Sequence, residues 1–276
     1  MKCPKCGKEM RTGYLFTSKD GAFSFANEVP GVFENAKKSE GFVEITPLKA
    51  SHRTNIAANC CDECRMVAFK HLVIYVHGKG GNANEAEHYK PFFAESDVIG
   101  FDYQAQNPWE AQKEFSSFFE VHSQVYDSVT LIANSIGAFF SMSALTKKQV
   151  AQAILISPVV NMEKLIVDMM MWANVTEEEL RIKKEIPTEF GETLSWEYLC
   201  YVREHPIVWN VPTCILYGEK DNLTSIETIS EVAERIGASL TVMKDGEHWF
   251  HTEEQMEFLD DWIRNTKEIK SGLNIL

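Results

Sequence analysis

The sequence predicts an α/β protein in which a mostly parallel, doubly wound sheet follows a small cysteine-rich β unit. Five of the seven cysteines lie within the first 64 residues. Beyond residue 69, short apolar runs alternate with segments that begin like helices. Charge divides in the same way, because residues 1–70 carry 11 basic and 8 acidic side chains, whereas the remainder carries 16 and 32. We therefore predict two units, residues 1–68 and residues 69–276.

Composition excludes several classes of protein. The chain has 276 residues, 45% of them hydrophobic, which suffices for one large domain with a small appendage. Its first ten residues are polar, unlike a signal peptide, and no apolar run is long enough to span a bilayer. The acidic second unit lacks the clustered Lys and Arg that phosphate contacts need. We expect a cytoplasmic protein with no membrane partner and no nucleic-acid partner; the oligomeric state is not predicted.

Two C-x-x-C pairs mark the first unit, “CPKCG” at 3–7 and “CDEC” at 61–64. They supply four thiolates, the set that encloses a tetrahedral structural zinc. We predict as its ligands Cys3, Cys6, Cys61 and Cys64. Clustered cysteines in a reducing cytoplasm favour a metal over disulfides, and a small unit needs such a staple. Three alternatives stay open: Cys60 in place of Cys61, iron in place of zinc, and unligated or redox-active thiols.

The first unit resembles the zinc ribbons, in particular the small CPxCG-type domains of unknown function found in bacteria. The matching residues are “CPKCGKEMRTGYL” and “CDEC”, although the loop between them is far longer than in a compact ribbon. Short aromatic and β-branched runs at 13–18, 22–26 and 41–46 predict antiparallel strands within that loop. The resemblance implies a bound zinc whose four thiolates leave no open position, and therefore a structural metal.

The second unit contains six apolar runs of strand length. They are apolar on both faces, as buried parallel strands are, and lie at 71–78, 97–103, 128–135, 153–158, 213–218 and 239–246. Helix starts are predicted at 107–110, 224–227 and 252–255 from capping patterns. More than fifty residues separate the fourth and fifth runs, where a crossover needs about a dozen. We predict a helical cap insert there, at about 159–206, with a capping box at 176–179.

A serine, an aspartate and a histidine each follow one of these runs. Ser135 ends the third run in “LIANSIGAFF”, where Gly137 permits the sharp strand-to-helix turn on which nucleophilic serines stand. Asp221 follows the fifth run in “YGEKDNLTS”, and His248 follows the sixth in “KDGEHWF”. The carboxyl ends of parallel strands meet at one edge of a sheet, so these three side chains are expected to lie together.

The Gly-rich loop “HGKGG” at 77–81 follows the first run. Such a loop can turn backbone N–H groups toward a developing oxyanion, and the N–H of Ile136 is a second candidate donor. Two alternatives to the residues named above stay open: Glu219 could replace Asp221 as the acid, and His251 could replace His248 as the base.

The second unit resembles the α/β-hydrolase superfamily, above all the small bacterial serine hydrolases. The Ser, Asp, His order and the “HGKGG” loop carry the resemblance. It implies that Ser135 is the nucleophile, His248 the general base and Asp221 the acid that orients it. It also implies that the backbone N–H groups of Lys79 and Ile136 form the oxyanion hole. The chain departs from the motifs through Ala133, which replaces the first glycine of G-x-S-x-G, and through the charge of Lys79.

These patterns predict a serine hydrolase that cleaves a small ester, thioester or amide through an acyl-enzyme, with no cofactor in the chemistry. Met169, Met170, Met171 and Trp172 of the insert are candidates for an apolar substrate wall. The alternative is a non-catalytic protein of the same fold whose ribbon docks a protein or nucleic acid. The intact Ser, Asp and His set favours the enzyme.

Overall fold

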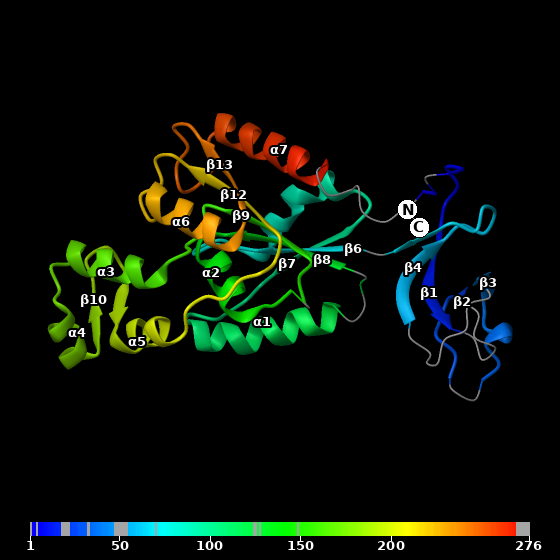
Figure 1. The fold of residues 1–276 in the computed structure, drawn as a ribbon, viewed down its shortest axis with the longest axis horizontal. Helices are drawn as coiled ribbons and strands as arrows, with labels where there is room; N and C mark the ends of the chain where they lie inside the picture. Colours follow the sequence, from blue (N-terminus) through cyan, green and yellow to red (C-terminus); the bar gives the residue numbers. More distant parts are fainter. Residues whose placement is uncertain are drawn as a thin grey trace.

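Two separate β-sheets organise the chain (Figure 1). The computed structural model describes residues 2–3, 5–17, 23–31, 34–46, 55–69, 71–123, 126, 128–147 and 149–268. Ser18 and Ala22, at the ends of two predicted strand runs, lie outside the described residues. Among the helices of the described part, none is long and apolar enough to cross a membrane.

The first sheet is antiparallel, as the aromatic runs predicted. Its strands are β1 (Arg11–Thr17), β2 (Phe23–Ala26), β3 (Val43–Thr46), β4 (Asn55–Cys60) and β5 (Val67–Phe69). They lie in the order β3-β2-β1-β4-β5, with the short 3₁₀ helix η1 (Ala36–Lys38) between β2 and β3 in the chain. Phe16, Phe25 and Ala58 are fully buried in this unit. So small a core gains little free energy from burial, which is why a metal staple suits it.

The second sheet is parallel and doubly wound, which confirms the predicted fold class. Its strands are β6 (His71–Val76), β7 (Asp97–Phe101), β8 (Ser128–Asn134), β9 (Gln152–Ile156), β12 (Thr213–Gly218) and β13 (Ser239–Met243). The order is β13-β12-β9-β8-β6-β7, and all neighbouring pairs are parallel. The order reverses at β6, so the carboxyl ends of β6 and β8 flank the point where such sheets bind ligands.

Helices cover both faces of this sheet because alternate residues of each buried strand point to opposite sides. One face packs against α1 (Pro108–Ser123), α2 (Ser135–Ala144) and α6 (Ile226–Ile236). The other packs against the 3₁₀ helix η2 (Ala83–Phe93) and α7 (Glu253–Glu268). In β6, for example, Ile74 belongs to the first core and Tyr75 to the second. The predicted helix start at 224–227 is one residue early, because Ser225 caps α6 by accepting from the Thr228 N–H.

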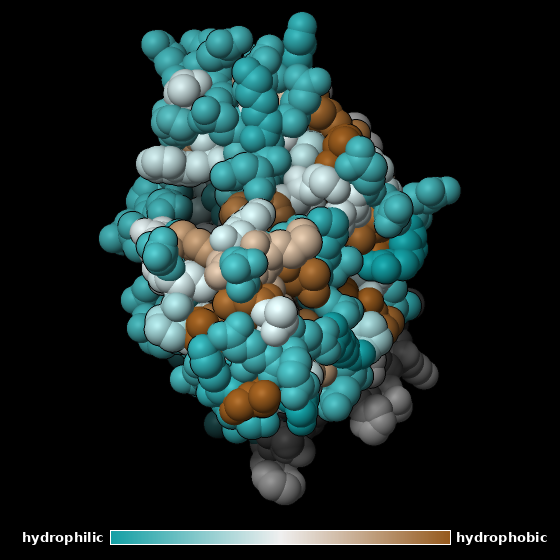
Figure 2. Space-filling view, turned by 90° about the vertical axis from the view of Figure 1, so that its left-hand side faces the viewer, coloured by the Kyte–Doolittle hydropathy of each residue, from teal (hydrophilic) through white to brown (hydrophobic). Residues whose placement is uncertain are grey.

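A mainly helical insert lies between β9 and β12, as the long spacing predicted, at the left of Figure 1. It contains α3 (Met162–Trp172), α4 (Glu177–Lys183), β10 (Glu185–Pro187), β11 (Thr193–Ser195) and α5 (Trp196–Glu204). Thr176 caps α4, as predicted, and Arg203 of α5 bonds to Glu163 of α3 and Glu177 of α4. The β10–β11 hairpin was not predicted. Figure 2 views this end of the molecule and shows apolar side chains among hydrophilic ones.

Candidate active site and cysteine cluster

Ser135 stands at an abrupt change from strand to helix. The preceding residue, Asn134, is extended and ends β8, whereas Ser135 has a φ of +49° and begins α2. A non-glycine residue in this left-handed region is strained, and such strain concentrates at functional sites. A Cβ on Gly137 would lie 2.2 Å from the carbonyl oxygen of His77. Only glycine therefore lets α2 begin this close to the end of β6.

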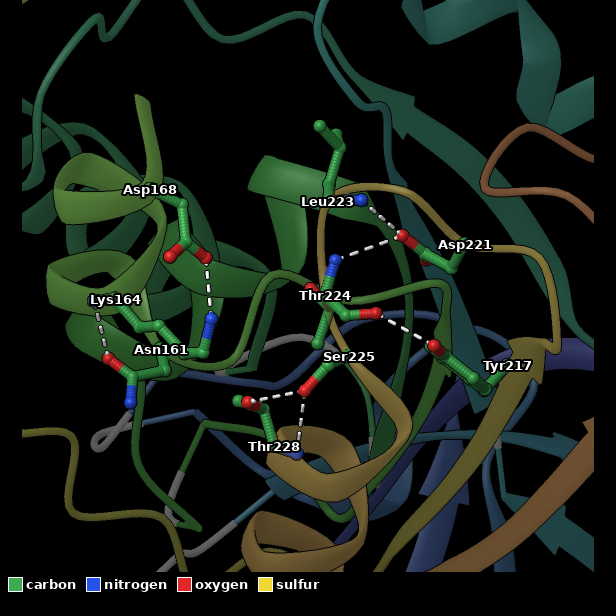
Figure 3. A network of polar contacts seen from close by, with 9 residues as sticks. All are labelled: Asn161, Lys164, Asp168, Tyr217, Asp221, Leu223, Thr224, Ser225 and Thr228. Atoms are coloured by element: carbon green, nitrogen blue, oxygen red, sulfur yellow. Dashed lines mark hydrogen bonds and ion pairs between the residues drawn. The ribbon is translucent and has the colours of Figure 1, made fainter. Parts of the chain in front are cut away.

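Ser135, His248 and Asp221 form one hydrogen-bonded chain. The Ser135 Oγ lies 2.8 Å from His248 Nε2, and His248 Nδ1 lies 2.7 Å from Asp221 Oδ2. The Asp221 side chain is fully buried, and its Oδ1 accepts the N–H groups of Leu223 at 2.8 Å and Thr224 at 3.0 Å (Figure 3). These backbone bonds fix the carboxylate, so that its second oxygen is available to orient the imidazole.

Neither Glu219 nor His251 takes part in the hydrogen bonds that join Ser135, His248 and Asp221. Glu219 accepts the backbone N–H of Asp245 at 3.0 Å, which ties its carboxylate to the loop after β13. His251 is exposed, stacks on Trp249 and bonds through Nδ1 to the Trp249 carbonyl oxygen. The geometry therefore favours Asp221 and His248 over Glu219 and His251.

The Gly-rich loop after β6 lies against the nucleophile. A Cβ on Gly78 would be 3.1 Å from the Cβ of Ser135, and the Gly81 N–H closes a turn by donating to the Gly78 carbonyl at 3.1 Å. The Lys79 side chain points to the insert, where it pairs with Glu192. Ile136 is in the first turn of α2, where backbone N–H groups have no partner within the helix.

A cavity of about 680 Å³ opens beside Ser135 and His248. The Gly78–Gly81 loop and residues of η2 and α7 form its walls. Apart from the loop, Ser135 and His248, the lining residues are Tyr75, Glu85, His88, Tyr89, Asn134, Ile156, Leu223, Trp249, Phe250, Met256 and Leu259. Most of these are apolar or aromatic, as in sites for small organic ligands.

The proposed apolar wall from α3 is wrong for this cavity, because none of its four residues is among the lining. Met170 is buried in the core, whereas Met171 and Trp172 are 66% and 54% exposed. Trp172 instead contacts the ring of Phe190, which lies between β10 and β11. Four consecutive residues of a helix point to different sides, so they cannot all face one cavity.

Three side chains that line the cavity and bond to one another were not predicted from the sequence, namely Tyr75, Glu85 and Asn134. Tyr75 stands inside an apolar strand run, where an aromatic residue looks like ordinary core. A signal was present for Glu85, because “NANE” at 82–85 has capping-box spacing. In the structure both bonds of that box are formed.

The four predicted cysteines lie together in the first unit, with their sulfur atoms within 4.8 Å of one another. The Cys3–Cys64 and Cys6–Cys61 sulfurs are 3.2 and 3.5 Å apart. Sulfurs bound tetrahedrally to zinc at about 2.3 Å lie about 3.8 Å apart, so the cluster fits this metal. Cys60 lies outside it, directed toward the carbonyl oxygen of Cys61 at 3.8 Å.

Strand pairing overcomes the long loop between the two cysteine pairs. β1 and β4 pair antiparallel with Arg11 opposite Cys60, which brings the residues before β1 beside those after β4. Burial opposes ionisation of Cys3, but hydrogen bonds from the Cys64 thiol and from backbone N–H groups lower its pKa to about 6. The same hydrogen bond raises the pKa of the Cys64 thiol, so the pair favours a thiolate at Cys3 and keeps the proton on Cys64.

Comparison with solved structures agrees with this architecture. The chain is similar to Est1E from Butyrivibrio proteoclasticus, with a TM-score of 0.59 and 11% identity over 94% of this chain and 99% of that one. It is similar to alpha/beta hydrolase domain-containing protein 10 from mouse, with a TM-score of 0.59 and 18% identity over 82% and 98%. A peroxisomal alpha-beta-hydrolase from Saccharomyces cerevisiae gives a TM-score of 0.54 and 13% identity over 97% and 91%. The second unit therefore has the α/β-hydrolase fold.

Residues 3–73 match the family described as “Domain of unknown function (DUF6487)”. That match spans the four clustered cysteines and the strands of the first sheet. No curated protein matches the chain.

Proposed function

We propose that the protein is a serine hydrolase that cleaves a small ester, thioester or amide. The observation that supports this is the chain from Ser135 Oγ to His248 Nε2 at 2.8 Å and from His248 Nδ1 to Asp221 Oδ2 at 2.7 Å, beside a cavity of about 680 Å³. A nucleophile within hydrogen-bond reach of a base, which a buried acid orients in turn, is the arrangement that acyl transfer requires.

In the first half-reaction Ser135 Oγ attacks the carbonyl carbon, and its proton passes to His248 Nε2. Asp221 accepts a hydrogen bond from the Nδ1–H group of His248 and stabilises the imidazolium. The carbonyl π electrons move to oxygen, and the backbone N–H groups of Lys79 and Ile136 bind the resulting oxyanion; losing one such donor typically costs roughly 3–4 kcal/mol of barrier. When the tetrahedral species collapses, the leaving alcohol, thiol or amine takes the proton from His248.

Water completes the cycle. His248 accepts a proton from the attacking water, a second tetrahedral species forms, and its collapse breaks the bond between the acyl carbon and Ser135 Oγ. The serine recovers its proton from His248, and a carboxylic acid leaves. The Lys79 side chain takes no part, because it is paired with Glu192 and only its backbone N–H is used.

Labelling with a fluorophosphonate probe tests the proposal. We expect stoichiometric labelling of the wild-type chain and none of Ser135→Ala, with both proteins folded by circular dichroism. Folded wild type that resists the probe would refute the hydrolase assignment. Labelling that persists in Ser135→Ala would refute the choice of nucleophile.

We also propose that Cys3, Cys6, Cys61 and Cys64 hold one structural Zn²⁺. Four thiolates complete its coordination, so the metal would stabilise the first unit and supply no Lewis acid to the reaction. The short separations between their sulfurs support this assignment. We propose a domain boundary close to residue 69, between β5 and β6, with the cap insert between β9 and β12.

A further inference from the structure

A chain of three side chains runs from the nucleophile elbow to the Gly-rich loop. Asn134, the residue before Ser135, donates from Nδ2 to the Tyr75 hydroxyl at 3.1 Å. The Tyr75 hydroxyl in turn donates to the Glu85 carboxylate. Glu85 Oε1 also accepts the Asn82 N–H at 3.0 Å, through the capping box that begins η2. The three side chains come from three different elements: Asn134 from β8, Tyr75 from β6 and Glu85 from η2.

The Glu85 carboxylate lies directly against the loop. A Cβ on Gly81 would be 2.8 Å from Glu85 Oε1 and 3.0 Å from the Cβ of His77. Gly81 is therefore enclosed between the carboxylate on one side and the start of the loop on the other. Because the Gly81 N–H bonds to the Gly78 carbonyl, the place of Gly81 determines the turn that contains Lys79.

The core does not need these polar groups. Tyr75 is 1% exposed and packs in an apolar cluster with Tyr89, where phenylalanine would fill nearly the same volume. A buried hydroxyl costs free energy unless it is hydrogen-bonded. Packing alone would therefore be served as well by phenylalanine at position 75, and the Tyr75–Glu85 pair calls for another explanation. Burial, together with the nearby Tyr89 and Glu85, raises the pKa of Tyr75, so its hydroxyl stays a donor.

We propose that Tyr75 and Glu85 are positioning residues that hold the Gly78–Gly81 loop in register with Ser135, so that the Lys79 N–H faces the developing oxyanion. This inference rests on the proposed hydrolase function. The three side chains act through the loop. Asn134 fixes Tyr75 relative to the nucleophile, Tyr75 fixes the Glu85 carboxylate, and this carboxylate fixes Gly81. Displacing the loop weakens a contact made in the transition state, so kcat falls while substrate binding is kept.

The test measures hydrolysis of 4-nitrophenyl acetate by the full-length protein. We expect Tyr75→Phe and Glu85→Ala to lower kcat about tenfold to a hundredfold, short of the full loss of one oxyanion donor, with KM within about twofold. Glu85→Gln should recover part of the activity lost in Glu85→Ala, because its single amide oxygen can accept one of the two hydrogen bonds, from Tyr75 or from Asn82, that separate carboxylate oxygens accept in the wild type.

Two matched controls separate positioning from general damage. Tyr126→Phe also removes a tyrosine-to-carboxylate hydrogen bond, to Asp97 at 2.7 Å, but at the amino ends of the strands. Glu110→Ala removes a carboxylate from the first turn of α1, where it accepts the Gln106 N–H at 2.9 Å. Both controls should keep wild-type kcat.

A second readout reports on the oxyanion site alone. A boronic acid inhibitor, which mimics the tetrahedral oxyanion, should lose affinity for Tyr75→Phe by a factor similar to the loss in kcat. Wild-type kcat in folded Tyr75→Phe, equal losses in Tyr126→Phe, or unchanged inhibitor affinity would each overturn the positioning role. In those cases wild type still reacts with the fluorophosphonate probe, whereas failure of the proposed function leaves wild type itself unlabelled.

Discussion

Gly137 lies beneath the backbone of His77, so closely that a Cβ at position 137 would be 2.2 Å from the His77 carbonyl oxygen. The contact joins the first turn of α2 to the end of β6, and thereby sets the serine elbow beside the Gly-rich loop. The neighbouring atom is backbone, which cannot rotate away as a side chain can. The second glycine of the serine motif is thus a packing requirement of this site, whereas Ala133 at the first is fully buried without being glycine.

Gly137→Ala should therefore destabilise the protein and abolish labelling of Ser135. We expect a loss of about 2–3 kcal/mol in the free energy of unfolding, as for other overpacked sites. Equilibrium unfolding in urea measures this loss, provided that the slope of the unfolding free energy against urea concentration is the same in the variant and the wild type. Gly191→Ala is the control, because φ there is +86° but no atom of the described residues lies within 4 Å of the added Cβ. That variant should lose only about 1 kcal/mol from backbone strain and keep its labelling. Equal stability of Gly137→Ala and wild type would contradict the contact.

Asp221→Asn should remove activity without unfolding the chain. The amide can still accept the N–H groups of Leu223 and Thr224, but it cannot stabilise the imidazolium of His248. We expect kcat to fall by about 10⁴-fold, as when the acid of a triad becomes an amide. Steady-state hydrolysis of 4-nitrophenyl acetate measures the loss. Glu219→Gln is the matched control and should stay near wild type; the opposite pattern would make Glu219 the acid.

Cys61→Ser should release the metal, whereas Cys60→Ser should retain it. Only the Cys61 sulfur belongs to the cluster, although both side chains are buried. Elemental analysis of the purified full-length chain should find about one zinc in wild type and in Cys60→Ser, and none in Cys61→Ser. Zinc-free wild type, or a metal lost only from Cys60→Ser, would refute the site.

Acid should also release this zinc. A thiol must lose its proton before it binds, so protons compete with the metal. Occupancy should therefore be complete at pH 7 and decrease as the pH falls and protons return to the sulfurs. A chromophoric zinc indicator, read in a pH series, would follow the release; retention at pH 3 would contradict thiolate ligation.

Much of the site was predictable because its parts depend on local pattern and strand direction. Apolar runs located the parallel strands, and their carboxyl ends meet at one edge, so Ser135, Asp221 and His248 could be placed together without knowing any distance. The two C-x-x-C spacings predicted the four cysteines of the cluster, and the pairing of β1 with β4 brings the two pairs together. The resemblance already implied Asp221 as the acid, and the structure adds the direction of the side chains, because Asp221 bonds to His248 whereas Glu219 bonds to the Asp245 N–H.

Other features depend on tertiary packing that no local pattern encodes. The β10–β11 hairpin has three residues in each strand, too few to show alternation. Tyr75 has the appearance of core until Glu85, from a separate element, is brought to its hydroxyl. The cavity was assigned to the wrong element because the insert was expected to cover the active site, whereas Met256 and Leu259 of α7 line the cavity.

The position of the cavity leads to a prediction about substrate length. Met256 on α7 lines the cavity, so Met256→Trp should fill part of it and exclude long acyl chains. We expect kcat/KM for 4-nitrophenyl octanoate to fall at least roughly tenfold, while the value for the acetate stays within about twofold, because pocket contacts discriminate by chain length. Trp172→Ala is the control from the insert, where Trp172 ends α3, is 54% exposed and lies outside the cavity lining. It should leave both esters unchanged. If Trp172→Ala alters the preference for chain length and Met256→Trp does not, the acyl group binds under the insert and not between η2 and α7.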